Sequence, residues 1–174
     1  RMVFIAPHVK DQYLALSKLD SGKAVEIDNY IDFEKVVPGK VEDDRGFNIG
    51  IVGIVPKLKN PILALNIFDL VWKNDKRCRL IIKGKRPEEF PWLTKNKNEV
   101  QYYEEMQSII DASPWKDNVE YSAFGTDMKE FYGRVGFVLS TSDLEGSHQS
   151  VGEALAAGCI PILRDWEGSE RVYK

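Results

Sequence analysis

The sequence predicts an α/β protein in which helices cover both faces of one doubly wound parallel sheet. From residue 47 onward, short apolar runs alternate with longer segments that carry a helical period. Strands that alternate with helices in this way are typical of βαβ units, which build parallel sheets. Three of the apolar runs, at 80–82, 137–139 and 160–163, show no polar alternation. This pattern is expected of strands that are covered on both faces.

The N-terminal part of the chain is less regular, and a polar stretch at 38–46 separates it from the rest. This stretch contains Pro38-Gly39 and a run of charged residues, which is typical of an exposed loop or linker. We therefore divide the chain into residues 1–46, an interdomain segment with the end of a preceding domain, and residues 47–174, a ligand-binding domain truncated at its C-terminus. The elements expected before the boundary are a strand end at 3–5, a helix at 11–19, a turn at 20–23 and a strand at 24–27.

Local signals mark the element ends in the regular part of the chain. Asn60 followed by Pro61 is a helix start, because asparagine caps free amides and proline fits the first helical position. Gly158 is suited to end a helix in the left-handed conformation. In chain order we expect strand 47–55, helix 61–73, strand 78–83 ending at Gly84, helix 99–112, strand 119–123, helix 127–134, strand 137–139, helix 151–157 and strand 159–163.

Composition excludes several classes of protein. The 24 basic and 27 acidic residues give a net charge of −3, so no overall positive field attracts nucleic acid or anionic lipid. Two cysteines, Cys78 and Cys159, lie beside apolar runs and are expected to be buried thiols in a reducing compartment such as the cytoplasm. We expect no signal peptide and no membrane span. Because the chain begins with Arg1, we expect a piece of a longer protein.

The segment 140–158 contains the densest set of candidate functional residues. Small polar residues follow the strand that ends at Leu139, at the carboxyl edge of the sheet, where ligands bind in open α/β proteins. A helix that starts near Val151 would point its free amides and dipole toward this edge, which suits an anion such as phosphate. Gly146 would let the backbone approach a ligand closely.

Two carboxylates, Glu145 and Glu153, lie in this segment with seven residues between them. Glu153 has a structural alternative, because Ser150-Val-Gly-Glu153 matches a capping box in which the glutamate only starts the helix. Glu145 has one too, as a solvated loop acid. The residues alone leave the structural and functional interpretations open.

The spaced glutamates, followed by Ala-Leu-Ala-Ala-Gly and an apolar strand with Pro161, resemble the nucleotide-sugar motif of family 4 (group 1) glycosyltransferases. These are retaining enzymes of the GT-B fold, with two facing Rossmann-like domains. The resemblance implies that this chain is the C-terminal, donor-binding half, which transfers a hexosyl group from a nucleotide-diphosphate sugar to a glycan or lipid-linked acceptor. It implies no metal or other cofactor. It also implies that the chain alone is inactive, because the acceptor is held by the N-terminal domain.

The resemblance also implies roles for individual residues. Glu145 would contact the hydroxyls of the transferred sugar, and Glu153 would hold the ribose of the nucleotide. Lys59, in the turn after the first strand, would meet the diphosphate together with the backbone amides from Gln149 to Val151. Glu145 and Lys59 are the catalytic residues that the resemblance implies. Other segments that resemble the family are 27–32, 48–61, 80–84, 118–125 and 126–139. The remaining donor-binding residues are Gly53, Gly146, Ser147, His148, Gln149, Ser150 and Val151.

The sequence departs from the family pattern at three places. Ile54 stands where an arginine is common, Ser147-His148 replaces Phe-Gly, and Asn60 replaces the glycine after the lysine. Without the arginine fork, we expect Lys59 and the helix amides to carry more of the diphosphate charge. We expect the other lysines near these turns to be solvated charges and His8 to have no partner at metal or triad spacing; those lysines are Lys57, Lys83 and Lys85.

Two alternatives remain beside the transferase. One is a sugar epimerase of the same GT-B fold, and the other is a non-catalytic α/β domain for nucleotide binding or protein interaction. The expected partners are a nucleotide-sugar donor and an acceptor, with no nucleic acid. A peripheral contact of the full-length protein with the inner membrane is a further expectation.

Overall fold

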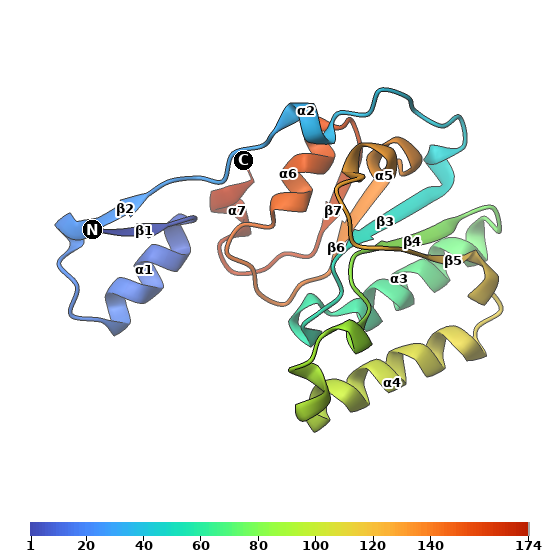
Figure 1. Ribbon diagram of the computed structural model, residues 1–174, viewed down its shortest axis with the longest axis horizontal. Coiled ribbons are helices and arrows are strands. Elements are labelled where there is room, and N and C mark those ends of the chain that lie inside the picture. The colour runs from blue at the N-terminus through green and yellow to red at the C-terminus, as the bar shows by residue number, and fades with distance from the viewer. Residues whose placement is uncertain (174) are drawn as a thin grey trace.

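A five-stranded parallel sheet forms the centre of the computed structural model, which describes residues 1–173 (Figure 1). Its strands lie in the order β5-β4-β3-β6-β7. This confirms the predicted α/β fold with a parallel, doubly wound sheet. The strands are β3 (Asn48–Val52), β4 (Arg79–Lys83), β5 (Val119–Ser122), β6 (Phe137–Ser140) and β7 (Ile160–Leu163). The helices that connect them are α3 (Pro61–Asn74), α4 (Lys97–Ala112), α5 (Met128–Arg134) and α6 (Gln149–Ala156).

The apolar runs of β3, β4 and β6 supply two separate cores, one on each face of the sheet. The prediction that the run 160–163 is also covered on both faces is wrong, because β7 is an edge strand in which Ile160 and Ile162 are exposed. In β4, Leu80 and Ile82 belong to the core beneath α3 and α4, whereas Ile81 belongs to the core beneath α5 and α6. Phe68 and Trp115 meet edge to face in the first core, with 5.4 Å between ring centroids. Because successive side chains of a strand point to opposite faces, an unbroken apolar run requires cover on both sides.

The N-terminal residues form a small βαβ unit of their own. Strands β1 (Met2–Phe4) and β2 (Ala24–Glu26) pair in parallel, and α1 (Pro7–Leu16) connects them. The helix begins at Pro7, four residues before the expected start at residue 11, because proline occupies its first turn. Two short α-helices were not predicted: α2 (Phe33–Val36), which packs on α5 and α6, and α7 (Ser169–Val172), which contacts α1.

Several elements differ in length from their predictions. β3 ends at Val52 rather than at residue 55, because Gly53 takes a φ of +74° and turns its amide to the carbonyl of Lys83. α4 begins two residues early, since the Asn96 side chain accepts hydrogen bonds from the amides of Asn98 and Glu99. α3 starts as predicted at Pro61.

Cys78 and Cys159 are both buried free thiols, as predicted. Burial raises the pKa of each thiol above its ordinary value, so both stay protonated. Within residues 1–173, none of the helices combines the length and the apolar character that crossing a bilayer requires.

Candidate functional site

The candidate site lies where the winding of the sheet reverses. From β3 the chain moves outward through β4 to β5, then crosses back past β3 to β6 and β7. The loops that follow β3 and β6 therefore leave the sheet in opposite directions, and ligands bind in the crevice between such loops. Lys59 lies on the first of these loops and Glu145 on the second. The topology thus brings the two predicted catalytic residues to one place.

Lys59 and Glu145 are in direct contact. The Nζ atom of Lys59 lies 2.5 Å from Oε1 of Glu145, and the side chains are 24% and 13% exposed. The hydroxyl of Ser142 donates to the same carboxylate oxygen over 2.6 Å. Burial acts to raise the pKa of Glu145, but the hydrogen bonds from Lys59 and Ser142 outweigh it and hold the pKa below its usual value. The carboxylate is therefore charged and oriented at neutral pH.

Backbone contacts fasten the two loops to each other. The hydroxyl of Thr141 donates to the carbonyls of Lys59 and Asn60 over 3.0 and 2.9 Å. The amide of Asp143 donates to the carbonyl of Leu58 over 2.8 Å. Asn60 adopts the left-handed conformation and caps α3 with its side chain, which accepts from the amide of Leu63. The turn before α3 is thus a rigid support for Lys59.

His148 occupies the cap position of α6 and is buried beneath the ion pair. Its Nδ1 atom lies 2.7 Å from the hydroxyl of Ser140 and 3.6 Å from Oε1 of Glu145. Burial, followed by the charge of Lys59, lowers the pKa of His148 to about 4. The imidazole is therefore neutral at pH 7 and orders the loop through its hydrogen bond to Ser140.

Glu153 does not form the capping box that its spacing from Ser150 suggests. The helix begins at Gln149, so Ser150 lies inside the first turn, and its hydroxyl is buried with no partner within residues 1–173. The Glu153 carboxylate instead accepts from the hydroxyl of Tyr132 over 2.9 Å and from Nε2 of Gln149 over 3.0 Å. The structural interpretation of Glu153 as a cap is therefore wrong, and the start predicted near Val151 is two residues late.

The other predicted donor-binding residues lie around the start of α6. Glu153 and Gln149 line a pocket of about 570 Å³ that also includes Asp28 and Asn29. Ser147 and His148 line a smaller cavity of about 270 Å³ beside it. Val151 is fully buried, and its amide donates to the carbonyl of His148 over 3.0 Å, so the prediction that it binds the donor is wrong. A Cβ atom on Gly146 would lie 3.3 Å from Ile5, so this glycine makes room for the N-terminal unit.

A further pocket of about 400 Å³ opens at the ends of β3, β4 and β5. Gly53 lies on its wall, and Phe90 and Phe124 supply aromatic surface. The Nζ atom of Lys85 lies 5.5 Å from the centroid of the Phe124 ring and 5.9 Å from that of Phe90. Of the residues predicted to bind the donor, only Gly53 reaches this pocket.

Lys83 was predicted to be a solvated charge, and this prediction is wrong. Its side chain is 2% exposed, and its Nζ donates to the Ala123 carbonyl over 2.6 Å and to both carboxylate oxygens of Asp127 over 2.7 and 2.8 Å. It also reaches the Ser122 hydroxyl at 3.3 Å. A lysine at the end of a buried apolar strand was the available sequence signal, since such a charge needs a partner.

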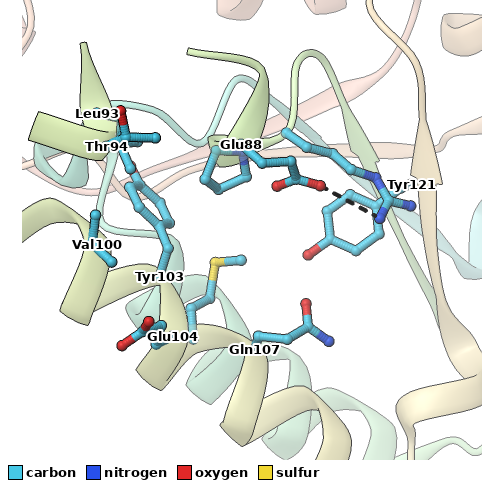
Figure 2. A pocket seen from close by; sticks show the side chains of 11 residues that line it. Glu88, Leu93, Thr94, Val100, Tyr103, Glu104, Gln107 and Tyr121 are labelled. Atoms are coloured by element: carbon cyan, nitrogen blue, oxygen red, sulfur yellow. Dashed lines mark ion pairs between the residues drawn. The ribbon is translucent and has the colours of Figure 1, made fainter. Parts of the chain in front are cut away.

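A pocket of about 360 Å³ lies apart from the predicted site residues, between α4 and the loop that follows β4. Figure 2 shows Tyr103 and Gln107 of α4 on one side and Glu88 and Tyr121 on the other. The guanidinium of Arg86 lies over the Tyr121 ring, 4.4 Å from its centroid. None of the predicted catalytic or donor-binding residues lines this pocket. Within residues 1–173, no cluster of three or more His, Cys, Asp or Glu side chains is arranged to hold a metal ion.

Comparison with known families matches residues 32–174 to the model of the glycosyl transferases group 1. The chain belongs to this family. The match confirms the resemblance seen in the sequence and covers the Lys59 loop, the Glu145 loop and α6. No curated protein matches the chain in sequence.

Several solved structures share the fold of this group 1 glycosyltransferase chain. TarM from S. aureus, in complex with fondaparinux, α-GlcNAc-glycerol and UDP, matches with a TM-score of 0.75 at 16% identity, over 95% of this chain and 30% of TarM. HepE from Anabaena, in complex with UDP and glucose, matches with a TM-score of 0.78 at 13% identity, over 99% of this chain and 46% of HepE. A glycosyltransferase from Rickettsia africae matches with a TM-score of 0.71 at 16% identity, over 96% of this chain and 45% of that protein. The chain spans less than half the length of each of these proteins.

Proposed function

We propose that this group 1 glycosyltransferase chain binds a nucleotide-diphosphate sugar in the crevice between the loops that follow β3 and β6. The observation that carries the proposal is the contact between Lys59 and Glu145 at the start of α6. A cation, a carboxylate and a set of free helix amides meet there. These are the groups that a diphosphate linked to a sugar requires.

The same groups suit the chemistry of retaining sugar transfer. When the bond between the anomeric carbon and the diphosphate breaks, negative charge develops on the leaving phosphate. Lys59 and the amides of Gln149 and Ser150 would stabilise that charge, and preorganised donors are most effective when they are fixed before the reaction. Lys59 is fixed by the backbone contacts of its turn to Thr141 and Asp143. The transition state would need no metal ion on this account.

The pockets on either side accommodate the rest of the donor. The pocket walled by Phe90 and Phe124 has flat aromatic surface and a nearby ammonium from Lys85, which suits a nucleobase. Glu153 has acceptor capacity beyond its bonds to Tyr132 and Gln149 and faces the adjoining pocket, which suits ribose hydroxyls. Glu145 would accept hydrogen bonds from the hydroxyls of the transferred hexose.

We also propose the partners that the resemblance implies. The structures of HepE and TarM contain UDP, which makes uridine nucleotides the first donors to test. A glycan or lipid-linked acceptor would be bound by a second, N-terminal domain of the full-length protein, in the cytoplasm or at the inner membrane surface. Two buried free thiols are consistent with a reducing compartment.

Isothermal titration with UDP, GDP and ADP, and with the glucose derivative of each, tests the proposal directly. We expect one diphosphate of the panel to bind, the corresponding sugar nucleotide to bind more tightly, and EDTA to leave both affinities unchanged. A chain that binds none of these ligands would favour the non-catalytic interaction domain. Binding that disappears with EDTA would contradict the metal-independent mechanism.

A further inference from the structure

His8 connects the N-terminal βαβ unit to the backbone of the candidate catalytic residue. Its Nε2 atom lies 2.8 Å from the carbonyl oxygen of Glu145, 137 residues away in the sequence. A carbonyl can only accept a hydrogen bond, so Nε2 carries the hydrogen and donates it. The side chain of His8 is 4% exposed, which shields this bond from water.

Packing holds the His8 ring in place for this contact. The ring lies against Trp166, with 5.4 Å between the ring centroids. On another side it touches Gly168, where a Cβ atom would come within 2.4 Å of the ring. Gly168 also has a φ of +95°, which other residues rarely adopt. The imidazole therefore has little freedom to swing away from the Glu145 carbonyl.

The loop from Glu145 to His148 is held at both of its ends. At its far end, the hydroxyl of Tyr173 donates to the carbonyl of His148 over 2.8 Å. Between the two ends, Ile5 packs toward Gly146. The carboxylate of Glu145 is held separately by Lys59 and Ser142. Backbone and side chain of Glu145 are thus fixed by different parts of the chain.

We propose that His8 is a positioning residue for Glu145: by holding the Glu145 carbonyl, it aims the carboxylate at the donor sugar only while the N-terminal unit is docked. The part that concerns the sugar rests on the proposed function, whereas the effect on the loop does not. Donor geometry would then depend on contact between the two parts of the chain, since the loop loses one restraint when they separate.

Amide hydrogen exchange without ligand tests the restraint, with His8→Leu and His8→Gln compared with the wild type. Leucine fills the space and cannot donate, whereas the Gln amide can replace Nε2 as a donor. We expect exchange of the 143–148 amides to be about three- to tenfold faster in His8→Leu, the range of one net hydrogen bond. His8→Gln should stay near the wild type. Equal exchange in all three proteins, or equal acceleration in both variants, would overturn the proposal.

Asp11→Asn provides the matched control. It weakens another contact of the N-terminal unit, the ion pair between Asp11 and Arg171 at 2.8 Å, and leaves the bond to Glu145 intact. We expect its 143–148 amides to exchange as in the wild type. Acceleration as large as that in His8→Leu would show that general docking, rather than the bond from His8, orders the loop, and the proposal would be wrong.

Titration with UDP and UDP-glucose tests the consequence for the donor. In His8→Leu we expect the affinity for UDP to be unchanged. The ratio of the affinity for UDP-glucose to that for UDP should fall by about three- to tenfold. If the role of His8 were purely structural, the binding of both ligands would weaken by the same factor. If the wild type binds neither these ligands nor the other nucleotides of the panel, the proposed function fails and the exchange experiment alone decides the role of His8. If the wild type favours UDP-glucose and His8→Leu does so equally, the positioning role fails while the proposed function stands.

Discussion

Lys59 and Glu145 form an ion pair across the reversal point of the sheet, with 2.5 Å between Nζ and Oε1 and 86 residues between them in the sequence. Each group neutralises the other when the crevice holds no ligand. A diphosphate carries more negative charge than one carboxylate and would compete for Lys59. Its binding would then leave Glu145 with free acceptor capacity, next to the position of a sugar attached to that diphosphate.

The first prediction concerns Lys59 as the main side-chain cation for the diphosphate. Ile54 stands where the family often has an arginine, and its side chain is buried in the core. We therefore expect Lys59→Ala to weaken UDP binding by about 1–3 kcal/mol, the range for hydrogen bonds to charged groups. Uridine binding should remain unchanged, since uridine has no phosphate. Paired isothermal titrations of UDP and uridine measure both effects.

Lys57→Ala is the matched control for this prediction. Lys57 lies two residues away on the same turn and is exposed. Its removal lowers the local charge equally but takes away no contact to Glu145. We expect a change in UDP binding of less than about 0.5 kcal/mol, as for surface substitutions in general. Equal losses in the two variants would mean that only the overall charge of the turn matters.

The sequence predicted the sheet because its signals are local. Apolar runs, Asn60-Pro61 and the glycines at turns each act within a few residues, and the strands and main helices formed where these signals stand. The predicted start of α6 was wrong because it, too, relied on a local signal. A local capping pattern favoured Ser150, but contacts from distant elements, Tyr132 to Glu153 and Ser140 to His148, favour a start at Gln149.

The contacts of His8 and Lys83 were beyond a local analysis of the sequence. His8 meets a carbonyl 137 residues away, and Lys83 meets Asp127 on another element. Neither partner is defined until the strand order and the docking of the N-terminal unit are known. The juxtaposition of Lys59 and Glu145 was implied only through the family resemblance, since spacing alone does not specify which strands are neighbours.

The second prediction separates the two roles of Glu153. Because no capping box forms, the structural role is to accept from the buried hydroxyl of Tyr132. Gln keeps an acceptor for Tyr132 but loses the charge, so Glu153→Gln should unfold near the wild-type temperature. Its uridine binding should weaken by about 1–2 kcal/mol, because charge-assisted hydrogen bonds are the stronger ones. Thermal denaturation and uridine titration measure the two properties.

Tyr132→Phe is the control for Glu153. It removes the hydroxyl and retains the carboxylate, so we expect lower stability with uridine affinity unchanged. If Glu153→Gln binds uridine as tightly as the wild type, the ribose role of Glu153 is wrong. Only its contacts with Tyr132 and Gln149 would then remain.

The third prediction is a pH dependence of stability that originates at His148. Its pKa falls from 6.5 in the unfolded chain to about 4 in the folded protein. Between these values the unfolded chain binds more protons, so acid favours unfolding. We expect the free energy of unfolding to decrease by about 1–3 kcal/mol as the pH falls from 6.5 to 4. Urea denaturation at a series of pH values measures this.

His148→Asn is the matched variant for the pH series. Asparagine can place an acceptor near the Nδ1 position for Ser140 but does not titrate. The slope between pH 6.5 and pH 4 should therefore be smaller than in the wild type. An unchanged slope would assign the pH dependence to other groups.

The fourth prediction concerns the ion pair of Lys83 and Asp127. The Lys83 side chain is 2% exposed and the Asp127 side chain is 55% exposed. The desolvation cost of the pair therefore falls mainly on the Lys83 ammonium. Asp127→Asn leaves that charge with neutral acceptors only, the Ala123 carbonyl and the Ser122 hydroxyl, and should lower the free energy of unfolding by about 1–3 kcal/mol. Lys83→Met keeps the volume and removes the buried charge, so its cost should be smaller, because apolar replacement of a buried charge is often neutral.

Acid provides an independent test of the same pair. Hydrogen bonding to Lys83 lowers the pKa of Asp127 below 3.8 in the folded protein. The stability that it contributes is therefore complete above pH 3.8 and is lost as the pH falls through the lower, folded value. We expect the wild type to lose stability in this range and Asp127→Asn to lose less, because it has no carboxyl to protonate at this position. Because Asp127 is more than half exposed, salt should reduce the difference. If Lys83→Met proves more destabilising than Asp127→Asn at neutral pH, the aliphatic chain of Lys83 does more than fill space, and the account of a costly buried ammonium is wrong.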